Sequence, residues 1–120
     1  MDLRTRIEDL TNTANRRVWR AAVRYTPQGG SPTTETPLGD TLYGVFDSAH
    51  LVTVELDGMQ VNDVRPVIEF VDDDLAAPPT RGALVELLSG RHAGEVFTVL
   101  EPHEDAAGAV MCELVAGTHA

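Results

Sequence analysis

The sequence predicts a mainly β protein: a small antiparallel β barrel or sandwich of about six to eight strands, with a short N-terminal α-helix and a projecting β-hairpin. Three observations predict this fold class. From Arg17 onward, apolar and polar residues alternate with the period of two that is typical of strands. Asp57-Gly58 separates two alternating segments, and this dipeptide favours a tight hairpin turn. Helical spacing of apolar residues is confined to the start of the chain.

The first segment has the pattern of an amphipathic helix over roughly residues 2–15. Leu3, Ile7, Leu10 and Ala14 recur at spacings of four, three and four. Residues 1–24 carry six Arg against three acids, about +3, whereas the rest carries three Arg against sixteen acids, about −13, for a total of −10. We therefore expect a basic helical arm over 1–16 and a β-barrel domain over 17–120. This strongly acidic domain argues against a conventional nucleic-acid-binding protein, which needs a positively charged surface to contact the phosphates.

A strand is predicted for residues 17–25, because apolar side chains alternate there with arginines. Trp19 falls on the apolar face, where a place in the core is favoured over a surface contact. The following segment, 27–40, contains three prolines and three glycines but few apolar residues. We expect it to be a mobile and unusually long connection between two strands of a hairpin.

The run 42–47 is rich in β-forming residues and predicts the strand on which the domain is built. Gly44 within it indicates a close approach by backbone or an aromatic ring, and Asp47-Ser48 suits a turn. Residues 48–64 then form the projecting hairpin, with Leu51, Thr53 and Glu55 on one face. The alternating apolar residues of the other face are Val52, Val54, Leu56, Met59 and Val61.

The last part of the chain predicts four further strands. Arg65-Pro66 opens the first, since proline is tolerated at a first strand position, and 67–71 is apolar on both faces. Asp72 to Asp74 form a solvated turn. The remaining three strands are predicted at 83–88, 94–101 and 109–116, separated by turns.

The sequence contains no motif that indicates catalysis, a cofactor or a metal site. The histidines match no metal-ligand spacing, the single Cys112 has no local partner, and the aspartates at 72–74 lack the glycine and distal glutamate of a calcium loop. Gly29-Gly30 lacks the lysine of a phosphate-binding loop, and Ser48 with His50 lacks a third catalytic group. The histidines are His50, His92, His103 and His119. With no disulfide framework, signal segment or membrane-spanning stretch, we expect a soluble protein of a reducing cytoplasm.

The order of segments resembles that of the head-tail joining proteins (head completion, or stopper, proteins) of long-tailed, lambda-like bacteriophages. The similarity extends from about Thr13 to Gly117 and depends on the order and spacing of short motifs after the N-terminal helix. These motifs are Tyr25-Thr26-Pro27 with Gly29-Gly30, Gly44-Val45-Phe46-Asp47, Arg65-Pro66-Val67-Ile68-Glu69-Phe70, Arg81-Gly82-Ala83-Leu84-Val85-Glu86-Leu87 and Phe97-Thr98-Val99-Leu100-Glu101-Pro102.

The resemblance implies a structural virion protein without catalysis, located in the neck between capsid and tail and assembled in the host bacterial cytoplasm. It implies a ring of six or twelve copies that completes the DNA-filled head and docks the tail. The implied partners are other copies of the chain, the portal or adaptor ring on the head side, and the tail terminator or tail tube on the tail side. The resemblance also implies that DNA passes through the lumen without specific binding, and the acidic body suits such a channel.

Two groups of residues are the candidates for subunit and partner contacts. The basic arm would reach an acidic neighbour, and the hairpin carries apolar residues on a projection that cannot bury both its faces. The candidates are Arg4, Arg6, Ile7, Leu10, Arg16, Arg17, Val52, Val54, Leu56, Met59 and Val61. The alternatives are a tail terminator ring of the same neck region and a free-standing β-barrel binding module. A small cupin-like enzyme is a third, which requires the histidines to converge.

Overall fold

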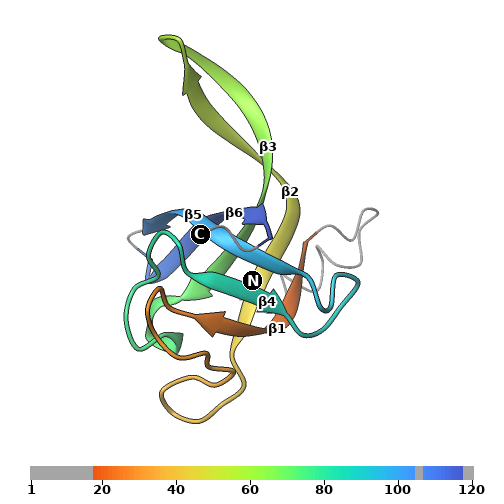
Figure 1. Cartoon of the computed structure of the whole chain (residues 1–120), viewed down its shortest axis with the longest axis vertical. Helices are drawn as coiled ribbons and strands as arrows, with labels where there is room; N and C mark the ends of the chain where they lie inside the picture. The colour runs from red at the N-terminus through yellow and green to blue at the C-terminus, as the bar shows by residue number, and fades with distance from the viewer. Residues whose placement is uncertain (1–17, 105–106, 118–120) are drawn as a thin grey trace.

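The computed structural model describes residues 18–104 and 107–117. Its strands pair antiparallel in one sheet in the order β1-β2-β3-β6-β5-β4, and β4 also pairs with β1, so the sheet closes into a barrel (Figure 1). The mainly β class and the six strands are as predicted. The helical arm predicted over 1–16 lies outside the described residues. The strands are β1 (Val18–Thr26), β2 (Tyr43–Leu56), β3 (Met59–Val71), β4 (Leu84–Leu87), β5 (Val96–Glu104) and β6 (Ala109–Ala116).

The core lies inside this closed sheet, and β1 shows how the alternating sequence produces it. Ala21, Val23 and Tyr25 are buried, whereas Arg20 and Arg24 on the opposite face are exposed. The burial of alternate residues confirms the strand and the arginine-bearing outer face that the period of two predicts.

Aromatic rings fill much of the core. The ring centroid of Phe46 lies 5.3 Å from that of Phe97 and 5.1 Å from that of Trp19. Trp19 is half-buried and packs against the core cluster, which confirms its predicted place. Tyr43 is on the outer face instead, where the guanidinium carbon of Arg20 lies 3.7 Å from its ring centroid.

Gly44 confirms the close approach that the sequence predicts at its position. A Cβ built on Gly44 would lie 2.6 Å from Cδ1 of Ile68 and 3.2 Å from Cε1 of Phe70. Both side chains come from β3, which pairs with β2 beside Gly44. The absence of a side chain at Gly44 therefore lets two large core residues fill the centre of the barrel.

The turn predicted at Asp47-Ser48 is wrong, because β2 runs through it without a break. Asp47 pairs with Val67 and His50 with Arg65, so two residues of β2 stand opposite the single Pro66 of β3. This is a β-bulge, and Asp47 Oδ1 accepts the backbone N–H of Ala49 at 3.0 Å. Pro66 likewise lies inside β3 rather than at its start, since a bulge needs no ladder bond from the missing N–H.

The connection 27–40 joins β1 to β2 as predicted, and backbone hydrogen bonds give it a folded-back form. Tyr25 and Thr33 exchange two bonds, of 2.9 and 2.8 Å, and the N–H of Thr36 donates to the carbonyl of Asp40 at 2.7 Å. Leu42 N–H donates to Thr34 O at 2.9 Å. These bonds satisfy the backbone where apolar side chains are few.

The C-terminal part agrees with the predicted order of a turn and three strands. Asp72–Asp74 forms a single 3-10 turn between β3 and the segment leading to β4; Asp72 and Asp73 are exposed and Asp74 is half-buried. β5 lies between β4 and β6, and its pairing with β6 carries a bulge between Val99 and Glu101. This bulge sets the direction in which Glu101 and the residues after it project.

Candidate functional site

The most distinctive feature outside the barrel is the hairpin formed by the ends of β2 and β3 beyond the bulge. Leu56 pairs with Met59, which leaves Asp57-Gly58 as a two-residue turn. Their φ angles of 51° and 79° are both positive, as a turn matched to the twist of the strands requires. The hairpin extends away from the barrel at one end of the molecule (Figure 1).

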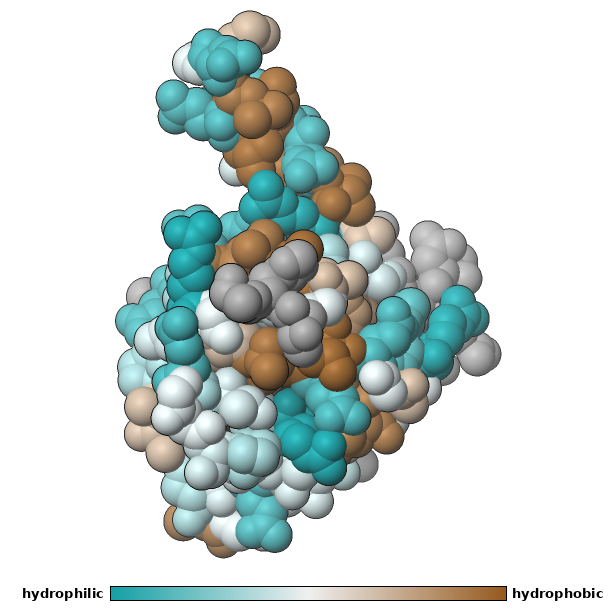
Figure 2. Space-filling model, in the orientation of Figure 1, coloured by the Kyte–Doolittle hydropathy of each residue, from teal (hydrophilic) through white to brown (hydrophobic). Residues whose placement is uncertain are grey.

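One face of this hairpin is an apolar stripe, which we call the stripe and define as the five apolar candidates Val52, Val54, Leu56, Met59 and Val61. Val54 lies opposite Val61 and Leu56 opposite Met59, so these side chains share a face. Exposure rises toward the tip, from 9% at Val52 to 60% at Leu56 and 67% at Met59. Apolar surface follows the length of the projection in Figure 2. The structure thus brings together the hairpin residues predicted as an interface.

The reverse face holds an apolar pair that sequence reasoning missed. Leu51 and Val64 are direct cross-strand partners, and they are 61% and 58% exposed. Alternation alone groups Leu51 with the polar Thr53 and Glu55. The signal that could have found the pair is symmetry, since Leu51 and Val64 are equally distant from the Asp57-Gly58 turn. The root of the hairpin is therefore apolar on both faces.

Charged side chains tie the root of the hairpin to the barrel. Arg65 Nη1 donates to Oε1 of Glu113 on β6 at 2.9 Å, and its Nε donates to Asp63 Oδ2 at 3.3 Å. On β2, the Nδ1 of His50 lies 3.3 Å from Oδ2 of Asp47. Glu113 and Asp47 are 7% and 8% exposed. Hydrogen bonds to the buried carboxylates of Glu113 and Asp47 orient the hairpin more firmly than exposed pairs would.

A comparison with protein families gives this hairpin its context. The model of the phage head-tail attachment proteins matches residues 5–114, which is most of the chain. The chain belongs to this family. No curated protein sequence matches it.

Membership carries a coarse statement of function. The family is structural rather than enzymatic, and it implies a place in the virion neck, with contacts to head and tail components. The match confirms the resemblance drawn from the order of short motifs. In the described part of this head-tail attachment protein, no helix is long and apolar enough to cross a membrane.

The other half of the predicted interface belongs to the basic arm and lies outside the described residues. These positions are Arg4, Arg6, Ile7, Leu10, Arg16 and Arg17. Their contribution to partner contacts stays a prediction.

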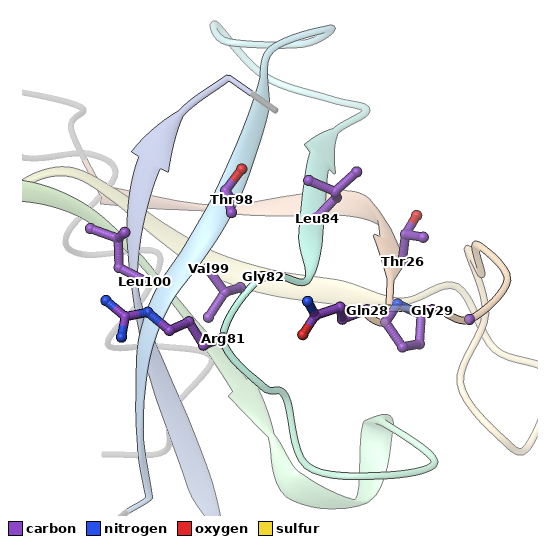
Figure 3. Close-up of a pocket in the computed structure, with 11 residues that line it drawn as sticks. Thr26, Gln28, Gly29, Arg81, Gly82, Leu84, Thr98, Val99 and Leu100 are labelled. Atoms are coloured by element: carbon purple, nitrogen blue, oxygen red, sulfur yellow. The ribbon is translucent and has the colours of Figure 1, made fainter. Parts of the chain in front are cut away.

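One hollow beside the described barrel lacks the carboxylate and imidazole groups that acid-base catalysis uses. It has a volume of about 600 Å³ and lies beside the loops that follow β1 and precede β4 (Figure 3). Its polar side chains are the long ones of Arg81 and Gln28 and the short hydroxyl side chains of Thr26 and Thr98. No carboxylate or imidazole lines it. The lining residues are Thr26, Pro27, Gln28, Gly29, Gly30, Arg81, Gly82, Leu84, Thr98, Val99 and Leu100.

The single cysteine is a core residue. Cys112 is fully buried, and burial raises the pKa of its thiol from 9.0 to about 12. A thiol with so high a pKa stays protonated at neutral pH, and the thiolate is the nucleophilic form. Cys112 therefore serves packing rather than chemistry.

Proposed function

We propose that this head-tail attachment protein forms a ring at the head-tail interface, completes the DNA-filled head and docks the tail. The observation that carries the proposal is the projecting hairpin with its exposed apolar stripe. Burying a large aliphatic side chain contributes roughly 1.5 to 3 kcal/mol. In the free chain Leu56 and Met59 are 60% and 67% exposed, so most of this stabilising free energy is not gained at these two residues. A neighbouring subunit or the tail-side ring that covers the stripe would recover it.

A ring of six or twelve copies fits the asymmetry of this surface. A closed ring is built from one patch meeting a different patch on the next copy. The hairpin is such a one-sided projection, and the barrel from which it rises offers a separate surface. The strongly acidic body, about −13 over residues 25–120, gives a lumen that does not bind the phosphates of passing DNA.

The test of the hairpin is a double variant, Val54→Ser with Leu56→Ser. We expect its melting temperature to stay close to that of the wild type, because the hairpin lies outside the barrel core, and we expect joining of filled heads to tails to be lost. Joining is measured by complementation of a phage that lacks the protein. The matched control is Thr53→Ser with Glu55→Ser on the polar part of the reverse face, which should join normally.

Two outcomes would contradict the role of the hairpin. A double variant that unfolds in isolation would make the stripe part of the core of its own barrel. A double variant that is folded and still joins heads to tails would remove the stripe from the mechanism.

The basic arm is the second part of the proposal. Arg4, Arg6, Arg16 and Arg17 contact acidic surface on a neighbouring subunit or on the adaptor ring of the head, and Ile7 and Leu10 add apolar contact. Each exposed ion pair contributes at most about 1 kcal/mol, so replacing the arginines by Glu in succession should weaken joining gradually. The loss should be sensitive to salt and largest at low ionic strength, because salt screens the interaction that the substitutions remove. Unimpaired joining after reversal of all four charges would refute this part.

A further inference from the structure

The structure brings together three metal-ligating side chains at the root of the hairpin. Glu101 and His103 of β5 and Glu113 of β6 each offer one ligand atom, and these atoms lie within 4.8 Å of one another. The Nε2 of His103 already contacts Oε2 of Glu113. Sequence spacing could not reveal this cluster, because Glu113 comes from the next strand.

The register of the two strands explains the convergence. After the bulge between Val99 and Glu101, Glu101 stands directly opposite Glu113. His103 lies two positions further along β5 and so projects from the same face as Glu101. The three side chains are therefore on the outer face of the barrel, on two paired strands that fix their spacing. Ligands placed on paired strands are held more accurately than ligands on loops.

Glu113 is held in the orientation that a ligand needs. Its Oε1 accepts the 2.9 Å hydrogen bond from Arg65 Nη1, and its Oε2 faces His103. The side chain of Glu113 is only 10% exposed, while that of His103 is 45% exposed. Glu113 is therefore held on the buried side of the cluster, and the side with His103 is open to solvent. An outer partner that fixes one oxygen of a carboxylate and leaves the other for the ion is a common arrangement around protein metals.

The charge balance also favours a cation. Glu101, Glu113 and Asp63 supply three negative charges here, and Arg65 bonds to both Glu113 and Asp63, so its single positive charge is shared between them. In the described residues no hydrogen bond to the Glu101 carboxylate is formed, so this second carboxylate is available beside the imidazole. A divalent ion in contact with the carboxylates of Glu101 and Glu113 would compensate the negative charge that Arg65 does not neutralise.

We propose that Glu101, His103 and Glu113 form a binding site for a first-row divalent cation of the zinc type. One imidazole nitrogen and two carboxylate oxygens suit Zn²⁺, whereas Ca²⁺ and Mg²⁺ prefer ligand sets made of oxygen alone. Water completes the coordination on the exposed side. The site adjoins Arg65, the residue at which β3 leaves the hairpin for the barrel, and a bound ion would strengthen the cluster that orients the hairpin.

The test is titration of the purified, tag-free full chain with ZnCl₂ by calorimetry, together with melting curves. The wild type should bind one ion per chain with a raised melting temperature, and MgCl₂ at the same concentration should not displace it. His103→Gln and Glu101→Gln should each weaken binding by roughly 10-fold or more, since loss even of an outer partner costs about that much. Both residues are exposed, so both variants should fold like the wild type without metal.

The matched controls are His92→Gln and Glu104→Gln. His92 pairs with Glu95 in a different loop, and Glu104 is an exposed carboxylate of β5 outside the cluster. These controls should bind Zn²⁺ like the wild type. The proposal is overturned if the wild type binds no Zn²⁺, or if His103→Gln binds as tightly as the wild type, since His103 and Glu113 would then only contact each other without holding an ion.

Discussion

At the scale of single residues, Gly44 decides how the barrel is filled. The side chains of Ile68 and Phe70 occupy the space that any side chain at position 44 would need. Sequence alone could predict that something approaches Gly44 closely, because a glycine inside a β-rich run often marks such an approach. It could not name Ile68, because the β2-β3 register sets the contact and the bulge at Asp47 shifts that register.

Gly44→Ala should lower the free energy of unfolding by about 1 to 3 kcal/mol, the usual cost of overpacking a core. Urea unfolding monitored by fluorescence measures it. The double variant Gly44→Ala with Ile68→Ala should be less destabilised than the sum of the single variants, because the clash is then absent. If the losses of unfolding free energy in the two single variants add exactly in the double variant, or if Gly44→Ala is as stable as the wild type, the close contact between position 44 and Ile68 does not restrict the residue at position 44.

Cys112 predicts an alkaline loss of stability. The folded thiol has a pKa raised by burial to about 12, whereas the unfolded chain ionises near 9.0. Between these values the unfolded state binds fewer protons than the native state, so the free energy of unfolding falls as pH rises, by about 1.4 kcal/mol per pH unit. Burial also raises the pKa of Tyr25 above 10.0, which adds to the loss.

Urea unfolding of the wild type and of Cys112→Val at a series of pH values from 8 upward checks this expectation. The variant should lose stability less steeply above pH 9. Parallel curves for the two proteins would contradict the assignment of the alkaline loss to the thiol.

At the scale of elements, the hairpin shows what sequence patterns can and cannot determine. Asp57-Gly58 and the flanking alternation were sufficient to predict the turn and the stripe, because both signals are local. Asp47-Ser48 and Arg65-Pro66 are turn and strand-start signals locally, but the two sites lie across from each other and form one bulge. The ion pair of Arg65 with Glu113 and the cluster around His103 depend on strand pairing, so spacing gives no sign of them.

The reverse face of the hairpin root gives a prediction at this scale. Leu51→Ser with Val64→Ser should change the melting temperature only slightly, since a cross-strand pair contributes roughly 0.2 to 1 kcal/mol. It should nevertheless reduce the yield of joined particles, though less than loss of the stripe does. Unchanged joining by this variant would limit the docking surface to the stripe.

At the scale of the whole molecule, closure of the sheet is the property least visible in the sequence. It depends on β1 pairing with β4, through contacts such as Val23 with Leu87 and Tyr25 with Val85, about 60 residues apart along the chain. The closed sheet leaves the hairpin as the long projecting element of the described structure. That division between a self-contained barrel and an exposed projection suggests how the protein behaves before assembly.

We expect the isolated protein to be monomeric or weakly associating at micromolar concentration, with 27–40 and the hairpin tip mobile until assembly. Ordering such segments on binding lowers affinity and so prevents premature rings. Sedimentation and amide hydrogen exchange measure both properties. A stable closed ring of purified protein, with these segments protected from exchange, would contradict this expectation.

The most direct test of the central claim, that the stripe is buried in the neck, is the reactivity of Leu56→Cys toward a maleimide. The native Cys112 is fully buried and should not react with the maleimide while the barrel is folded. Position 56 should react rapidly in the free, folded protein and far more slowly in joined particles. Equal rates at position 56 in free protein and in joined particles would contradict the account.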